Sequence, residues 1–365
     1  MSDDTPEKTD PHAPHGPPRA GATRRLLVLG GVVAAVVALV VGLLQLGGSD
    51  DATTAADAGG SGASDAGGGS GAVVEDNAAE KLVDADWLEA NLDDPSVVLI
   101  EVSTDEGLYE RGHIPGAVNF PWTTSFVDTV SRDVVSRETF GELTAAAGVD
   151  EDSTVVLYGD DNNWFAAWGA WVFNLYGHDN VKLLDGGRTK WDADGRAYDV
   201  AVPAAAAGSW QPAEADGELR ALFPEVLEVA QASADGDDPG AVLVDIRGAA
   251  EFNGEIFAPE GFQETAIRAG HIPGAVNVAW RETVNEDGTF KSADELRAIY
   301  AAHGIDGSEP VITYCRIGER ASHSWFVLSE ILGYDVSLYD GSWTEYGNAV
   351  GVPVVNNAGT VWGVA

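Results

Sequence analysis

The sequence has little cysteine and little positive charge. It holds one cysteine, Cys315, among 365 residues, so no intramolecular disulfide can form and stability must come from packing and hydrogen bonding. Lysine and arginine number 20 against 59 aspartates and glutamates, a formal net charge of −39. Such a field repels phosphate, which argues against nucleic acids and anionic lipid surfaces as partners. The charge is typical of a solvated acidic surface and also fits a salt-rich or extracytoplasmic setting.

Apolar residues make up 45% of the chain, and its length is enough for about two globular domains. One apolar run differs from the rest of the chain in its length and its lack of charge. Residues 26–46 carry no charge and have about the ~20-residue length that a helix needs to cross the hydrocarbon core. Two arginines precede this run and two aspartates follow it, which predicts a cytoplasmic tail at 1–25 and the bulk of the chain outside. We therefore expect a single-pass protein of the cell membrane; export followed by signal cleavage is the alternative.

The segment 47–79 is rich in glycine, alanine, serine and aspartate, which predicts a flexible linker. Beyond it, the octapeptide GHIPGAVN occurs at 112–119 and again at 270–277. Further landmarks recur in step downstream, including a short apolar strand ending in tyrosine and an Asp-Gly pair near a tryptophan. The repeat predicts two copies of one domain, at 80–202 and 219–365, with an interdomain linker at 203–218.

Each copy alternates short apolar runs with helical stretches. In the second copy, residues 241–246 and 310–314 have the composition of buried parallel strands. Helices are predicted over 223–233, with proline in the first turn, and over 294–303, ending at Gly304. This alternation predicts an α/β fold in which each domain has a mostly parallel sheet with helices on both faces.

Cys315 falls where the second of these strands ends. The tight loop that follows, through Arg320, opens into an amphipathic helix whose N-terminus faces the sulfur. Backbone N–H groups and the helix dipole favour an anion there, and Arg316 and Arg320 favour thiolate over thiol. Open α/β folds also place their ligands at the carboxyl ends of strands. These features favour a reactive nucleophile over an inert core cysteine.

The motif Cys-Arg-x-Gly-x-Arg, with GHIPGAVN in each half and the two Asp-Gly pairs, resembles the two-domain rhodaneses, which are thiosulfate sulfurtransferases. The resemblance covers roughly residues 81–353 and implies two tandem rhodanese-like domains. It implies a ping-pong reaction in which thiosulfate gives its outer sulfur to the cysteine and the persulfide passes it to cyanide or another thiophile. No metal and no cofactor are implied, and the catalytic region is expected to be monomeric.

The resemblance assigns the persulfide to Cys315 and substrate binding to three residues of its loop, Arg316, Gly318 and Arg320. Ile317 departs from the pattern, because thiosulfate-type loops often have a lysine there. Relatives that prefer 3-mercaptopyruvate carry small residues after the cysteine, so Arg316 speaks against that substrate.

Asp245 and Arg247 match an Asp-x-Arg motif at a strand end, where the family's aspartate orients arginines at the pocket. A structural ion pair is an equally open alternative for them. Glu251 stands where the family has a substrate-binding arginine, which removes one expected anion contact.

The first copy aligns with the second without gaps around this loop, and Gly159 takes the place of Cys315. Asp160 and Asp161 follow it, so the first domain is predicted to be non-catalytic. His113 and His271 recur in both copies, which indicates a structural role in the turn.

Two rival interpretations remain. Tyrosine phosphatases also hold a cysteine in an anion cradle, but they place five residues between cysteine and arginine, whereas this loop places Arg320 one residue closer. A persulfide carrier that accepts sulfur from another protein without turning over thiosulfate would use the same loop as the enzyme.

Overall fold

The computed structural model describes residues 76–363. The tail, the apolar run at 26–46 and almost all of the expected linker lie outside this range. Within it, no helix has the length and apolar character to cross a membrane. The membrane span therefore stays a prediction.

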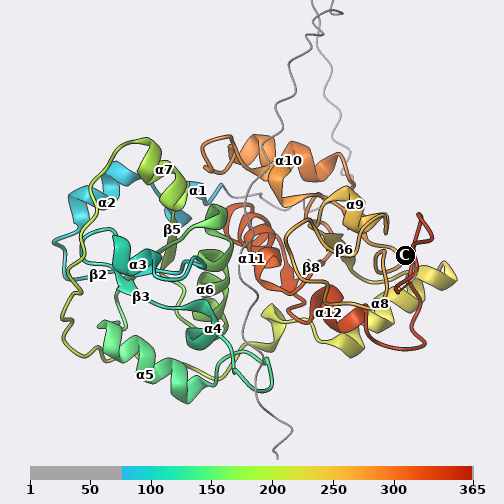
Figure 1. The fold of residues 1–365 in the computed structure, drawn as a ribbon, viewed down its shortest axis with the longest axis horizontal. Helices are drawn as coiled ribbons and strands as arrows, with labels where there is room; N and C mark the ends of the chain where they lie inside the picture. Colours follow the sequence, from blue (N-terminus) through green and yellow to red (C-terminus); the bar gives the residue numbers. More distant parts are fainter. Residues whose placement is uncertain (1–75, 364–365) are drawn as a thin grey trace, which may run out of the picture. The chain divides into compact units, whose positions relative to one another are not determined.

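The first domain, on the left in Figure 1, is built on a parallel sheet with strand order β1-β5-β4-β2-β3. Its strands are β1 (Leu82–Val83), β2 (Val97–Glu101), β3 (Val118–Asn119), β4 (Thr154–Tyr158) and β5 (Val181–Leu184). Its helices are α1 (Ala78–Lys81), α2 (Ala85–Asn91), α3 (Leu108–Arg111), α4 (Trp122–Ser125), α5 (Arg137–Ala147), η1 (Asp161–Asn163), α6 (Trp164–Leu175) and α7 (Gly187–Ala193).

The second domain repeats this plan with a parallel sheet of order β7-β6-β8-β9. Its strands are β6 (Val242–Asp245), β7 (Val276–Asn277), β8 (Val311–Tyr314) and β9 (Val336–Leu338). Its helices are η2 (Gly217–Leu219), α8 (Phe223–Asp235), α9 (Ala249–Phe252), η3 (Trp280–Thr283), α10 (Ala293–Ala301), α11 (Glu319–Trp325), the π-helical continuation η4 (Phe326–Ile331) and α12 (Ser342–Tyr346). The expected helices and strands are all present, with ends shifted by one or two residues.

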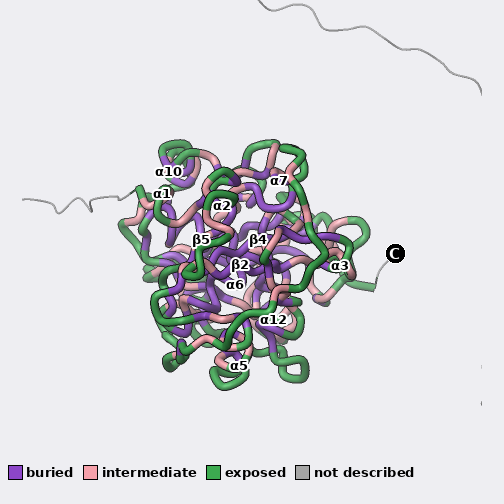
Figure 2. The backbone as a smooth tube through the Cα atoms, turned by 90° about the vertical axis from the view of Figure 1, so that its left-hand side faces the viewer, coloured by how far each residue is buried: buried purple, intermediate pink, exposed green. Residues whose placement is uncertain are grey.

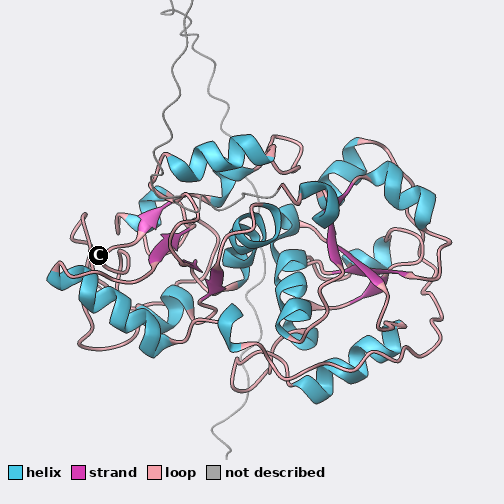
Figure 3. Ribbon diagram, turned by 180° about the vertical axis from the view of Figure 1, so that it is seen from behind, coloured by secondary structure: helices cyan, strands magenta, loops and turns pink. Residues whose placement is uncertain are grey.

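Helices cover both faces of each sheet, as predicted (Figure 3). Successive residues of a strand point to opposite faces, and in β4 Val155 and Leu157 pack with α5 and α6 while Val156 and Tyr158 pack with α2, α3 and α7. Figure 2 shows the strands running through the buried interior, with exposed chain on the outer turns. In β8, Tyr314 packs toward α8 and α12, so Cys315, the next residue, faces the opposite side, toward α10 and α11.

The two domains share one hydrophobic core across their facing helices. α6 of the first domain packs along α11 of the second (Figure 1), and the core cluster that holds Trp168 and Trp171 also contains Trp325 and Cys315. The predicted linker at 203–218 runs along the first domain, where Trp210 is buried against Phe140. The cysteine therefore lies in a region to which both domains contribute.

Candidate functional site

The loop after β8 turns back on the cysteine sulfur. The N–H of Gly318 donates to Cys315 Sγ at 3.1 Å, and the N–H of Cys315 donates to Ser342 Oγ at 3.0 Å. The N–H of Trp343 donates to the Cys315 carbonyl at 3.1 Å. The Cys315 side chain has no exposed surface. The sulfur is thus held by a backbone donor in a dry environment, and a substrate reaches it only when a neighbouring side chain moves.

Gly318 allows the loop to be this tight. Its φ of +107° lies in a region that residues with a Cβ rarely adopt. A Cβ at this position would lie 2.4 Å from the Asp340 carbonyl oxygen, far inside van der Waals contact. The glycine of the predicted motif is therefore needed for backbone geometry, and its N–H contacts the sulfur directly.

Arg320, one of the two arginines expected to bind the anionic substrate, has a carboxylate partner. Its Nη2 lies 3.4 Å from Glu251 Oε1, and both side chains are largely buried. The guanidinium also lies over the Trp164 ring of the first domain, 5.6 Å from its centre. Glu251, which replaces an expected arginine, therefore also neutralises part of the charge of Arg320.

Arg316 has no carboxylate within ion-pair distance among the described residues. Its Nη1 donates to the Gln263 carbonyl at 2.5 Å, its guanidinium lies over the Phe262 ring, and its Nε has no partner. Burial lowers the pKa of Arg316, as does the neighbouring Arg320, while the nearby Cys315 raises it. A buried guanidinium with a vacant donor beside the thiol is suited to bind an anion.

The extra residues of the second copy, 255–268, flank this arginine. Gln263 holds the Arg316 guanidinium, and Thr265 Oγ1 lies 2.8 Å from Thr344 Oγ1. Arg268 is anchored by three carbonyls of the C-terminal segment, so the base of the insertion is fixed. The structure therefore places this segment against Arg316.

Asp245 and Arg247 form a fully buried ion pair of 2.6 Å. Arg247 Nη2 also donates to the Gly270 carbonyl at 2.7 Å, which ties the pair to the turn of the repeated octapeptide. The Arg247 guanidinium lies over the Trp343 ring, 4.9 Å from its centre. The backbone N–H of Trp343 donates to the Cys315 carbonyl. The pair thus reaches the cysteine loop through Trp343.

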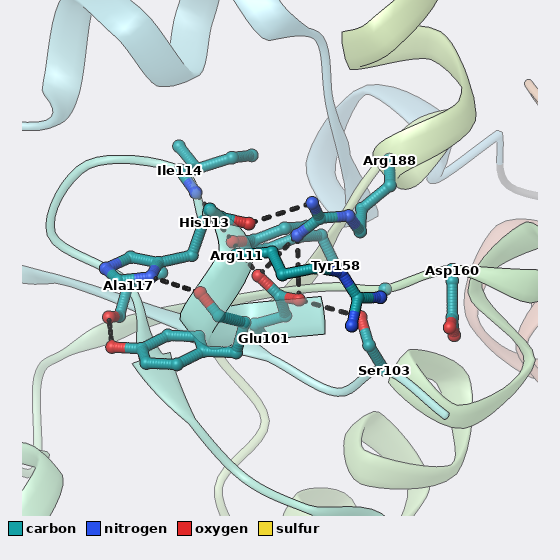
Figure 4. A network of polar contacts seen from close by, with 12 residues as sticks. Glu101, Ser103, Arg111, His113, Ile114, Ala117, Tyr158, Asp160 and Arg188 are labelled. Carbon is teal, nitrogen blue, oxygen red and sulfur yellow. Dashed lines mark hydrogen bonds and ion pairs between the residues drawn. The ribbon is translucent and has the colours of Figure 1, made fainter. Parts of the chain in front are cut away.

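The first domain contains a similar network without a cysteine, in which the arginine comes from α7 and not from the end of the strand (Figure 4). Arg188 pairs with the buried Glu101 at 2.8 Å and donates to the Gly112 carbonyl, the counterpart of Gly270. The Tyr158 hydroxyl donates to Glu101 and accepts from the Ile114 N–H. Since a domain without a nucleophile retains this network, it favours the structural alternative for Asp245 and Arg247; their substrate role stays a prediction.

The two octapeptide histidines have the contacts of structural residues. His113 stacks on Tyr109 at 3.8 Å, and His271 stacks on Phe252 at 3.6 Å. Nδ1 of each lies within hydrogen-bond distance of the carbonyl of its stacking partner. The interpretation of both as turn residues agrees with this geometry.

The loop that replaces the cysteine loop in the first domain is closed by its own side chains. Asp160 accepts from the N–H groups of Thr104 and Asp105, and Asn163 Oδ1 accepts from the Gly159 N–H. Asn163 thus takes up the N–H of the residue that stands in place of Cys315, and the Asp160 carboxylate lies where the second domain has Arg316. The loop therefore has no thiol, and its aspartates disfavour an anion.

Sequence reasoning missed two residues that meet at the cysteine loop. Glu319 is fully buried and pairs with Arg132 of the first domain. Burial raises the pKa of Glu319 to about 7 although Arg132 opposes the shift. Arg132 Nη2 also donates to the Ile317 carbonyl at 3.2 Å. No local pattern could reveal this contact, because its partners lie far apart in the chain.

The profile of the rhodanese-like domain matches residues 84–194 and 228–349. A protein of Saccharopolyspora erythraea, provisionally named a thiosulfate sulfurtransferase, is 50% identical over 279 residues, which cover 76% of this chain and 96% of that protein. A protein of Thermus thermophilus named sulfur carrier protein TtuD is 48% identical over 277 residues, 75% of this chain and 96% of its own.

The chain is also similar to solved structures. A 3-mercaptopyruvate sulfotransferase of Escherichia coli aligns with a TM-score of 0.59 at 30% identity, over 72% of this chain and 98% of that one. An anaerobic ergothioneine biosynthesis enzyme of Chlorobium limicola aligns with a TM-score of 0.65 at 25% identity, over 76% of this chain and 71% of that one. The profile matches lie in both domains, one in each copy of the repeat.

Proposed function

Since the chain belongs to the rhodanese family of sulfurtransferases, we propose that it transfers the outer sulfur of thiosulfate to cyanide or to a thiol acceptor through a persulfide on Cys315. The thiolate attacks the outer sulfur, a new S–S bond forms, and sulfite leaves with the electron pair of the bond that breaks. The acceptor then attacks the terminal sulfur of the persulfide and regenerates the Cys315 thiolate. The two half-reactions make the mechanism ping-pong.

The observation that carries the proposal is the state of Arg316. Thiosulfate is a dianion, and the site needs a cation that can turn toward it. Of the described arginines at the cysteine loop, Arg320 and Arg132 have carboxylate partners, whereas Arg316 is held by a carbonyl and keeps a free Nε donor. The Gly318 N–H donates to Cys315 Sγ and stabilises the thiolate that attacks the donor.

Two alternatives have specific support. The Escherichia coli relative is named for 3-mercaptopyruvate, but the bulk and charge of Arg316 next to the cysteine favour a smaller, more highly charged donor. The Thermus thermophilus relative is named a sulfur carrier. A carrier would use the same loop, and the buried sulfur fits both uses.

Steady-state turnover of the full chain separates these possibilities. With thiosulfate and cyanide, wild type is expected to form thiocyanate, with parallel lines in a double-reciprocal analysis of the two substrates. Cys315→Ser is expected to lose all activity above background, because the persulfide cannot form. Ser209→Ala, an exposed serine in the linker segment, is the control and should match wild type.

Each alternative has its own result. Faster turnover with 3-mercaptopyruvate than with thiosulfate would reassign the donor. Wild type that makes no thiocyanate, yet accepts sulfur at Cys315 from a persulfidated protein, would make the chain a carrier. Activity that survives in Cys315→Ser would refute the mechanism.

A further inference from the structure

A loop of the cysteine-free domain reaches the cysteine loop and holds both neighbours of Gly318. Arg132 Nη2 donates to the carbonyl of Ile317 at 3.2 Å and pairs with the Glu319 carboxylate. Gly318, between these two residues, donates its N–H to Cys315 Sγ. One guanidinium therefore binds the backbone of the residue before Gly318 and the side chain of the residue after it.

The same loop acts on the cysteine loop at a second point. Asp133, the next residue, pairs with Arg220 at 2.7 Å, and Arg220 pairs with Asp340 at 2.8 Å. The Asp340 carbonyl is the group against which Gly318 is packed. The cysteine loop thus lies between Arg132 and Asp340, and the residue after Arg132 is linked to Asp340 through Arg220.

Arg132 adopts a backbone conformation that is uncommon for a residue with a side chain, with φ of +65°. Its N–H donates to the Asp128 carbonyl at 2.9 Å, and its guanidinium lies 5.7 Å from the centre of the Trp122 ring. Strained conformations persist when surrounding contacts determine them, and they cluster at functional sites. Here the strained residue is the one that points into the other domain.

The contact between Arg132 and Glu319 depends on the charges around the Glu319 carboxylate. Arg132 from the first domain and Asp340 after β9 face Glu319, and Glu319 itself acts on Arg316 in the cysteine loop. Glu319 Oε2 is buried without a hydrogen-bond partner. The carboxylate therefore depends on Arg132 for its charged form, and loss of Arg132 leaves a buried acid that would be neutral at physiological pH.

We propose that Arg132 is a positioning residue for the catalytic loop, so that the first domain, which has no nucleophile, is required for full reactivity of Cys315. The inference rests on the proposed role of Cys315 as the nucleophile. Arg132 contacts the loop backbone and Glu319, and it acts on the reaction through the Gly318 N–H.

The test compares Arg132→Ala with Arg137→Ala in the full chain. Arg137 is the matched control, because it is similarly exposed and forms an ion pair with Glu214 within the first-domain region. The alkylation rate of Cys315 by iodoacetamide is measured from pH 6 to 9, together with kcat, KM for thiosulfate and the melting temperature. Arg132→Ala should slow alkylation and lower kcat by about tenfold or more, since small misplacements of a reacting group have large effects.

KM and the melting temperature should change little in Arg132→Ala, and Arg137→Ala should match wild type in every measurement. Arg132→Lys should recover part of the rate, because one ammonium can reach one of the two acceptors. Equal rates for Arg132→Ala and Arg137→Ala would overturn the proposal, as would a loss of rate that follows a loss of folded protein.

A double-mutant cycle shows whether Arg132 and Glu319 act together. If they act through one contact, Arg132→Ala/Glu319→Ala should be about as slow as the slower single variant; independent effects would multiply and would refute the coupling. Alkylation needs no sulfur donor. A wild type that fails to turn over thiosulfate would therefore defeat the proposed donor, while the alkylation rates still decide the role of Arg132.

Discussion

His323 lies on α11, the helix that directly follows the cysteine loop, and is fully buried. Its ring packs against Phe290 and Trp280, and neither ring nitrogen has a hydrogen-bond partner in the described part of the chain. Burial lowers the pKa of His323 to about 3. The folded protein therefore keeps this imidazole neutral, whereas in the unfolded chain it titrates near its ordinary pKa of 6.5.

This difference predicts an acid-sensitive fold. Between pH 6.5 and 3 the unfolded chain binds a proton that the folded protein does not, so the free energy of unfolding falls as the pH falls through this window. Between pH 6.5 and 4 the loss from His323 amounts to about 3 kcal/mol. His323→Leu should lose correspondingly less on acidification, as measured by urea unfolding at both pH values.

His303→Asn is the control for this comparison, because His303 is exposed and its replacement should leave the acid sensitivity of wild type in place. If His323→Leu loses as much unfolding free energy as wild type between the two pH values, the neutral buried imidazole is not the cause.

At the residue level, the sequence indicated which residues gather at the cysteine but not how their charges are distributed. Three residues of the motif lie around Cys315 because they are close to it in the chain: Arg316, Gly318 and Arg320. The pairing of Arg320 with Glu251 was not predicted, since it joins two helices, α11 and α9, that are far apart in the chain. A motif gives the residues of a loop, whereas their partners come from tertiary packing.

At the level of elements, the cysteine loop joins β8 to a helix of mixed geometry. α11 is α-helical over Glu319–Trp325 and continues as the π-helix Phe326–Ile331. π-Helical turns are rare and often lie near functional sites. The periodicity of apolar residues predicted one continuous amphipathic helix here, because the spacing does not distinguish an α-helix from a π-helical turn that is packed on all sides.

The tight turn before α11 gives a prediction about Gly318. In Gly318→Ala the new methyl group would meet the Asp340 carbonyl and push residue 318 away from the sulfur. We expect kcat/KM to fall by about 100-fold, the scale that a misplacement of about 1 Å produces. Steady-state kinetics and a thermal melt check the result.

Gly304→Ala is the matched control for the backbone. Gly304 also has a positive φ, +81°, but a Cβ there meets no atom within 4 Å. Gly304→Ala therefore introduces a Cβ at a positive φ without the steric contact at the cysteine loop. Equal activity in the two variants would mean that the Gly318 N–H is not needed at the sulfur.

The ends of helices and strands were predicted to within one or two residues where local chemistry marks them. α8 begins with proline in its first turn and ends at Gly236 in the left-handed conformation. The segment 203–218 shows the limit of such reasoning. Its composition predicts a linker between the domains, but composition does not indicate that Trp210 is buried against Phe140 of the first domain.

At the scale of the whole molecule, the repeat predicted the architecture because two copies of one pattern must fold in the same way. It could not predict that the two domains share a core. The facing helices α6 and α11 bury tryptophans from both copies in one cluster. The interface arises from side chains that differ between the copies, so the common pattern carries no signal for it.

The location of the protein remains a proposal that rests on residues 26–46. We expect this run to anchor the full chain in the cell membrane with both domains outside, because arginines precede the run and aspartates follow it. Protease added to intact spheroplasts of an expression host should then degrade both domains. Protection until the membrane is dissolved would place them inside, and a soluble product that lacks the run would indicate signal cleavage.

The single buried thiol has a consequence for the lifetime of bound sulfur. With one cysteine in the whole sequence, a persulfide at Cys315 meets no second thiol in its own chain that could attack it and release sulfide. Its place in the core, without exposed surface, also slows its encounter with stray thiols in solution. The persulfide would therefore persist until an acceptor that is small, or complementary in shape, displaces the side chains that cover Cys315.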